Sequence, residues 1–246
     1  MDLKQISQLK TRAMRFFIMY KFAIDEVSTK IDILRQEFQY IYGYNPIERV
    51  TSRVKTPQSI LNKVRRKGIE ISLPSIKENV RDIAGIRIVC SFISDIYKIK
   101  DTLENQADLE VVECKDYIKN PKENGYRSLH LIVKVPVITS DREEKVYVEI
   151  QLRTIAMDFW ANLEHKLYYK YNYEVPERLL NELKEAADLA AELDQKMEKI
   201  NCEINHYKEV SVKANGKAEE FFINSQRFIL SLDFLKLMLK TDETHD

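Results

Sequence analysis

Apolar residues recur at alternating steps of four and three positions in two long stretches of the chain, which is the spacing of a helix with one apolar seam. This spacing predicts one helix over residues 3–42 and another over residues 176–208. The seam of the first helix consists of Tyr20, Ile24, Val27, Ile31, Leu34, Phe38 and Ile41. We expect each seam to pack against another helix, either within the chain or between subunits.

Between the two long helices the pattern changes to the period of two that is typical of half-buried strands. Strands are expected at about 50–55, 86–92, 109–115, 127–136 and 145–153. Shorter helices are expected at about 57–67, 75–80, 94–106 and 155–170. Strands and helices in this arrangement predict an α+β fold, in which a mixed sheet of about five strands is flanked by helices.

The same pattern divides the chain into four parts. They are an N-terminal helical segment over residues 1–43, a core over residues 44–175, a C-terminal helix over residues 176–210 and a tail over residues 211–246. Within the tail, the apolar composition of residues 221–239 predicts one further helix, which we expect to pack on a neighbouring helix.

The charges of the whole chain cancel, since 39 lysines and arginines stand against 39 aspartates and glutamates. Such a balance produces no overall field that would draw the protein to DNA, RNA or an anionic membrane. Locally the balance differs, because residues 44–68 hold seven basic residues and the single acid Glu48, and this segment is a candidate anion site. The sequence contains no signal peptide and no apolar run long enough for a bilayer, so a cytoplasmic location is expected.

The strand expected at 145–153 has an unusual polar face. Its apolar residues alternate with Glu149, Gln151 and Arg153, which places a carboxylate, an amide and a guanidinium in a row. This set suits a metal ion, a phosphate and a reacting hydroxyl group. The alternative is an exposed strand face with a solvated ion pair.

A second candidate lies at residues 81–90, where Asp82 and Gly85 precede a strand that carries Arg87 on its polar face. A short carboxylate at the mouth of a strand can ligate a hard cation such as Mg²⁺. The alternative is that Asp82 only forms a turn or a cap.

Basic residues gather on and just before the helix expected at 57–67. Lys63 and Arg66 are three positions apart and therefore share a helix face, and Arg53 and Lys55 share a strand face. These four cations could converge on a polyphosphate, or they could form a solvated basic surface. A glycine-rich phosphate loop is absent from the sequence, so phosphates would have to be held by lysine and arginine.

The third constellation spans residues 120–130. Asn124 and Gly125 predict a turn, after which Tyr126 is placed to lie flat on a base. His130 follows on the polar face of the next strand, where it is either a functional residue or a structural one.

These motifs, in this order and spacing, resemble the alarmone synthetases of the RelA/SpoT family, and most closely the small single-domain members of Gram-positive bacteria. The resemblance runs over residues 20–197 and includes the runs at 156–160 and 163–165. It implies a nucleotidyltransferase-like fold and the transfer of the β,γ-pyrophosphate of ATP to the 3′-hydroxyl of GDP or GTP. The products would be AMP and ppGpp or pppGpp.

The resemblance also implies a role for each candidate residue. Asp82 would bind Mg²⁺, and Glu149 would be a second ligand, the general base for the 3′-hydroxyl, or both. Arg53 and Arg87 would sandwich the adenine. The ATP phosphates would be held by Lys55, Lys63 and Arg66. The acceptor nucleotide would meet Lys115, Lys122, Tyr126, His130, Gln151, Asp158 and Glu164. Asp158 stands where some members carry Asn, so it could shift acceptor preference.

Further expectations follow from the family. Small members are homotetramers, and the two seamed helices are suitable surfaces for this assembly. The only adjacent His-Asp pair, His245 and Asp246, is the last two residues, so no hydrolase activity is expected. Two alternatives remain: a tRNA 3′-end pyrophosphokinase of the same fold, and a non-catalytic sensor of guanine nucleotides. The preference between GDP and GTP and any allosteric regulation are left open.

Overall fold

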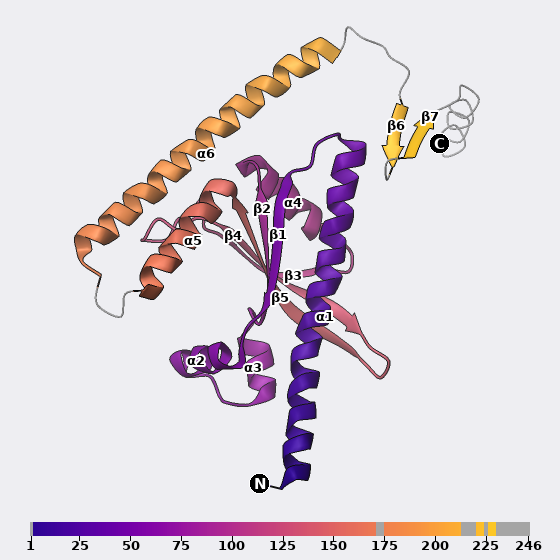
Figure 1. Cartoon of the computed structure of the whole chain (residues 1–246), viewed down its shortest axis with the longest axis vertical. Helices are drawn as coiled ribbons and strands as arrows, with labels where there is room; N and C mark the ends of the chain where they lie inside the picture. Colours follow the sequence, from indigo (N-terminus) through magenta and orange to yellow (C-terminus); the bar gives the residue numbers. More distant parts are fainter. Residues whose placement is uncertain (1, 171–174, 213–219, 224–225, 230–246) are drawn as a thin grey trace.

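The computed structural model describes residues 2–170, 175–212, 220–223 and 226–229 (Figure 1). Its helices are α1 (Leu3–Ile41), α2 (Pro57–Lys67), α3 (Leu73–Asn79), α4 (Ile93–Glu104), α5 (Ile155–Lys170) and α6 (Glu177–Val212). Its strands are β1 (Ile47–Val54), β2 (Ala84–Cys90), β3 (Glu110–Asp116), β4 (Leu129–Ile138), β5 (Glu143–Thr154), β6 (Glu220–Ile223) and β7 (Gln226–Ile229). From α1 to α6, each helix and strand lies where the apolar periodicity predicts it.

Short sequence signals set the ends of α2, which carries part of the basic segment. The Thr56 side chain accepts a hydrogen bond from the backbone N–H of Ser59, and Pro57 occupies the first turn. At the other end Gly68 adopts the left-handed conformation, with φ of 64°, which stops the helix.

The central sheet has five strands in the order β1-β2-β5-β4-β3. Only β2 and β5 run parallel to each other, and the other neighbours are antiparallel, so the expected mixed sheet is confirmed. The parallel pair brings together two strands that are far apart in the sequence, and it forms the middle of the sheet.

One face of this sheet is covered by α1 and α4, whose buried residues share one core with the sheet. The α1 seam from Tyr20 to Phe38 is buried there, while Ile41 is exposed. The expectation that the α1 seam packs on another helix is therefore wrong, because the sheet supplies a broader apolar surface than a single helix would. The opposite face carries the alternate, polar positions of the strands.

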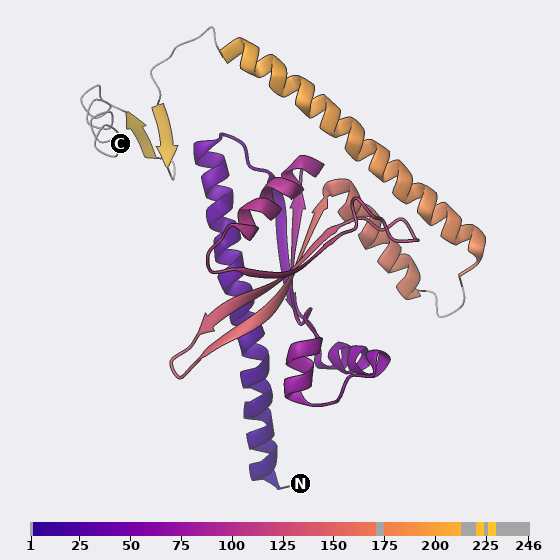
Figure 2. The same ribbon diagram turned by 180° about the vertical axis from the view of Figure 1, so that it is seen from behind.

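The two C-terminal helices α5 and α6 pack against each other at one side of the sheet, as Figure 2 shows from behind. The predicted seam of α6 is largely exposed, with Leu193, Met197, Ile200 and Ile204 facing solvent. The described residues contain no helix that is long and apolar enough to cross a membrane.

The tail differs from its prediction where the structure describes it. Glu220–Ile223 and Gln226–Ile229 pair as an antiparallel two-stranded sheet, so the helix expected from residue 221 onward is wrong for these positions. The β-branched and aromatic residues that suggested an apolar helix are equally typical of strands. The remainder of the expected helix, over residues 230–239, lies outside the described residues.

Candidate functional site

Strand register gathers four of the candidate residues, together with Thr51, into one row on the open face of the sheet. Thr51 of β1 lies opposite Arg87 of β2, which lies beside Gln151 of β5, and that residue lies opposite His130 of β4. The row ends at Lys115 of β3. Since side chains alternate between faces along each strand, these five residues point to the same side. Five separate segments of the sequence thus contribute to a single surface.

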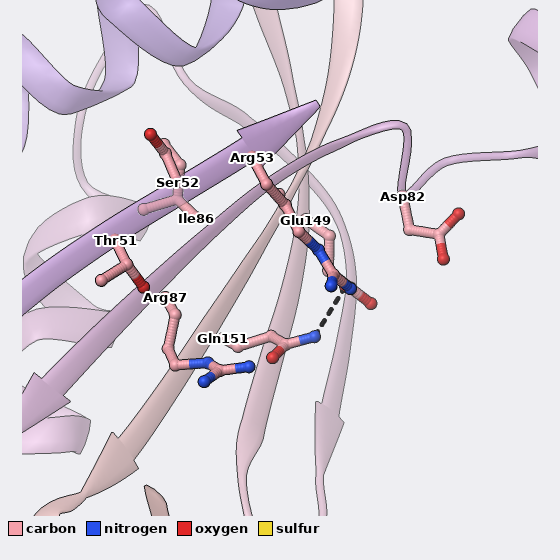
Figure 3. A pocket seen from close by; sticks show the side chains of 9 residues that line it. Thr51, Ser52, Arg53, Asp82, Ile86, Arg87, Glu149 and Gln151 are labelled. Carbon is pink, nitrogen blue, oxygen red and sulfur yellow. Dashed lines mark hydrogen bonds between the residues drawn. The ribbon is translucent and has the colours of Figure 1, made fainter. Parts of the chain in front are cut away.

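A cleft of about 250 Å³ opens over the β1-β2-β5 part of this row. Figure 3 shows most of its lining residues, which are Thr51, Ser52, Arg53, Asp82, Gly85, Ile86, Arg87, Glu149 and Gln151. Both arginines expected at an adenine ring and both carboxylates expected at a metal ion therefore line the same cleft.

Asp82 lies at the mouth of β2 between two lysines. Its Oδ2 accepts hydrogen bonds from Lys55 Nζ and Lys63 Nζ, each at 2.6 Å. Burial raises the pKa of Asp82, but the hydrogen bonds and charges of the two lysines outweigh this effect, and the net pKa lies below the usual range. The other oxygen, Oδ1, is buried and has no hydrogen-bond partner among the described residues. One carboxylate oxygen thus stays available to a cation.

Glu149 is held from both sides on the polar face of β5. Gln151 Nε2 donates to its Oε2 at 2.8 Å, and His130 Nδ1 lies 3.5 Å from its Oε1. Burial raises the pKa of Glu149, yet the hydrogen bond and charge of His130 and the bond from Gln151 bring the net pKa below its usual range. The residue is therefore a carboxylate, with oxygens that can accept protons or bind a cation.

Tyr126 is placed beside His130 by the turn that precedes it. Its hydroxyl lies 2.8 Å from His130 Nε2, and its ring lies under Lys122 Nζ at 4.9 Å from the centroid. Gly125 adopts a φ of 85°, and an added Cβ there would lie 2.6 Å from Cβ of Ala187 on α6. Only glycine allows the turn to sit this close to the helix, which in turn sets the position of Tyr126.

Asp158 does not face the cleft, and its side chain is only 2% exposed. Its Oδ2 accepts from Arg49 at 2.5 Å, and its Oδ1 accepts from Arg87 at 3.1 Å and from Arg153 at 3.2 Å. The carboxylate is therefore buried and already bonded to arginines, and its contact with the acceptor nucleotide stays a prediction.

The remaining predicted residues lie at the edges of the site. Lys115 pairs with Glu113 at 3.0 Å, and Glu164 of α5 accepts a hydrogen bond from Asn124 at 3.2 Å. The Arg66 side chain is exposed on α2 and forms no hydrogen bond or ion pair within the described part of the chain. Of the four cations expected to converge, only Lys55 and Lys63 share a partner.

Arg153 was expected on the polar face of β5, but no specific role in the site was predicted for it. Its side chain is buried, and its Nη2 donates to the Tyr126 hydroxyl at 2.8 Å and to Gln151 Oε1 at 3.1 Å. The alternation of the strand already pointed to Arg153, since this residue continues the polar face that begins at Glu149. Thr51 and Ser52 also line the cleft, but nothing in their local sequence distinguishes them from solvated strand residues.

Comparisons with known proteins identify the family. A family profile described as "Region found in RelA / SpoT proteins" matches residues 52–174. The GTP pyrophosphokinase YwaC of Bacillus subtilis is 56% identical over 188 residues, which cover 76% of this chain and 90% of that protein.

Solved structures give the same result. The small alarmone synthetase 2 of Bacillus subtilis is 54% identical with a TM-score of 0.70, and the match covers 76% of this chain and 96% of that one. The small alarmone synthetase 1 of the same organism, bound to its product pppGpp, is 44% identical with a TM-score of 0.73. That match covers 78% of this chain and 98% of the other.

Proposed function

This chain belongs to the RelA/SpoT family, and we propose that it acts as a small alarmone synthetase. It transfers pyrophosphate from ATP to the 3′-hydroxyl of GDP or GTP, which yields AMP and ppGpp or pppGpp. The observation that carries this function is the cleft itself, in which two carboxylates and two arginines converge from β1, β2, β5 and the turn before β2.

ATP binds over β1 and β2 in this proposal. Arg53 and Arg87 line the cleft from neighbouring strands, and their planar guanidinium groups stack on the adenine. Lys55 and Lys63 already point at one position, since both reach Asp82 Oδ2. Phosphate oxygens that enter there take over these charge-assisted hydrogen bonds, and Arg66 adds a more distant positive charge.

The guanine nucleotide binds on the β4 side of the row. Its base stacks on Tyr126, and its 5′ phosphates meet Lys122 and Lys115. This arrangement puts the ribose near Gln151 and His130, with the 3′-hydroxyl directed at Glu149.

Mg²⁺ fits the residues present. The buried and unpartnered Oδ1 of Asp82 offers one ligand, and Glu149 lies close enough to interact with Asp82 electrostatically. The described residues contain no cluster of three or more acidic, histidine or cysteine ligands. Asp82 and Glu149 would hold the ion, and substrate phosphates and water would supply its other ligands, as is usual for Mg²⁺. When bound, Mg²⁺ neutralises charge on the transferred phosphoryl groups.

Glu149 acts as the general base in this scheme. A ribose hydroxyl is a weak nucleophile, and a carboxylate within hydrogen-bond reach accepts its proton as the bond to the β-phosphorus forms and AMP leaves. His130 and Gln151 keep the carboxylate ionised and oriented. The rest of the acceleration comes from positioning and charge neutralisation, because the transition state of phosphoryl transfer is loose.

The assembly and location of the protein are part of the proposal. We infer a homotetramer, supported by the exposed apolar seam of α6 from Leu193 to Ile204. We also infer a cytoplasmic location and no hydrolase activity.

The test is nucleotide chromatography of purified protein with ATP, Mg²⁺ and either GDP or GTP. The wild type should form AMP and a 3′-pyrophosphorylated guanosine nucleotide, and Glu149→Gln should lower the rate on the order of 10²–10⁴-fold. Glu110→Gln is the matched control, since Glu110 is an exposed carboxylate on β3 outside the cleft. No product from the wild type with either acceptor would refute the proposal, and labelled product on added tRNA would favour the tRNA enzyme instead.

A further inference from the structure

Arg153 and Asp158 form a buried ion pair that lies between the two proposed nucleotide sites. The Arg153 side chain is 6% exposed and the Asp158 side chain 2%. Through Nη2, Arg153 bonds to Tyr126 and Gln151 on the acceptor side, and through Nη1 it bonds to Asp158 Oδ1. The same Oδ1 accepts from Arg87, which lines the ATP cleft.

In the site of the guanine nucleotide, Arg153 closes a ring of hydrogen bonds. An arginine can only donate, so the Tyr126 hydroxyl accepts from Arg153 and has its own proton free for His130 Nε2. That leaves His130 Nδ1 as the nitrogen that donates toward Glu149 Oε1. Gln151 donates to Glu149 Oε2 and accepts from Arg153, which completes the ring. Arg153 can only donate and the Glu149 carboxylate can only accept, so these two residues together set the direction of the bonds in the ring.

In the ATP site, Asp158 is the carboxylate that holds Arg87. Arg87 Nη1 bonds to Asp158 and to Asn162, whereas its Nε is buried without a partner among the described residues. The Nε of Arg153 is likewise buried and has no hydrogen-bond partner among the described residues. Both guanidinium groups are therefore oriented through their terminal nitrogens, and both depend on one carboxylate. Breaking a buried pair of this kind leaves an uncompensated charge that forces its neighbours to move.

We propose that Arg153 and Asp158 are a positioning pair that fixes the adenine-stacking Arg87 and the guanine-stacking Tyr126 relative to each other. Neither residue touches the reacting atoms. The pair instead transmits any displacement in one nucleotide site to the other, so that both substrates are held in a single geometry for in-line transfer. This inference rests on the proposed function, because that function assigns the two sites.

The first test is the KM for each substrate in single variants. Asp158→Ala should raise the KM for both ATP and GDP and lower kcat, with a combined loss on the order of 10- to 100-fold. Arg153→Met, which keeps the apolar stem, should raise mainly the KM for GDP. Asp158→Asn retains one acceptor oxygen and should shift the same parameters less, which covers the case in which the alanine variant does not fold.

The second test combines the two changes. If Asp158 acts on the acceptor site through Arg153, then adding Asp158→Ala to Arg153→Met should raise the KM for ATP further but leave the KM for GDP unchanged. A merely structural role would raise both. Arg142→Met is the matched control, since Arg142 pairs with the neighbouring Asp141 between β4 and β5 and belongs to neither network, and it should leave both KM values unchanged.

The outcomes separate this inference from the proposed function. A wild type that makes no alarmone contradicts the proposed function. The positioning pair can then still be tested by calorimetric titration of each variant with a non-hydrolysable ATP analogue and with GDP. The pair is refuted if a folded Asp158→Asn or Asp158→Ala variant keeps both KM values, or both binding constants, within twofold of the wild type. It is also refuted if the Asp158 change raises the KM for GDP equally with and without Arg153.

Discussion

Replacing Gly125 by alanine should damage the acceptor site indirectly, by displacing the turn that positions Tyr126. The residue adopts a φ of 85°, which costs an L-residue about 1–2 kcal/mol. Its new Cβ would also lie 2.6 Å from Cβ of Ala187, far inside ordinary van der Waals contact, so either α6 or the turn must move. Overpacking of this kind costs about 1–3 kcal/mol, which brings the expected loss to about 2–5 kcal/mol.

The matched control is Gly68→Ala. Gly68 has nearly the same conformation, with φ of 64°, but an added Cβ would meet nothing within 4 Å. Its replacement therefore reports the backbone strain alone, about 1–2 kcal/mol. For a chain of this length each kcal/mol lowers the melting temperature by about 2–4 °C, so Gly125→Ala should melt several degrees below Gly68→Ala.

Kinetics measured on the same two variants test the link to function. Tyr126 follows Gly125 directly, so Gly125→Ala should raise the KM for GDP and GTP about tenfold through displaced stacking and leave the KM for ATP within twofold. Gly68→Ala should change neither. Equal melting temperatures for the two variants, together with an unchanged KM for GDP, would refute the argument that contact with α6 positions Tyr126.

Two further predictions concern the cleft and the response to pH. Gly85→Val should raise the KM for ATP at least tenfold, because the new side chain enters the cleft. The melting temperature should not fall, because the added Cβ meets only Arg53, at 3.9 Å, and valine suits a strand. A fall in melting temperature would contradict this. Burial raises the pKa of Asp194, the hydrogen bond from Thr154 lowers it, and the net pKa lies above the usual range. A carboxyl group with a raised pKa in the folded state stabilises the fold fully below its unfolded pKa, and this contribution is lost as the pH rises through the folded pKa. The wild type should therefore lose stability between pH 4 and pH 7, whereas Asp194→Asn should not. In thermal melts the stability of the variant relative to the wild type should rise over this range. A difference that stays constant with pH would argue against it.

Much of the fold follows from short-range patterns in the sequence. Alternation along residues 145–153 predicted both the strand and the face that bears Glu149 and Gln151, and the basic segment predicted the two lysines that meet Asp82. These features depend on the period of a strand or a helix, which the sequence carries in full. The same periodicity could not distinguish strand from helix in the short apolar runs at 220–223 and 226–229.

The partners of each face were decided only by the tertiary structure. The α1 seam packs on the sheet rather than on a helix, Asp158 lies buried among three arginines, and Arg153 joins the two halves of the site. The row from Thr51 to Lys115 exists because β2 lies parallel to β5 at one register. Local pattern determines which way a side chain points, whereas strand order and register, set by the packing of the whole core, determine what it meets.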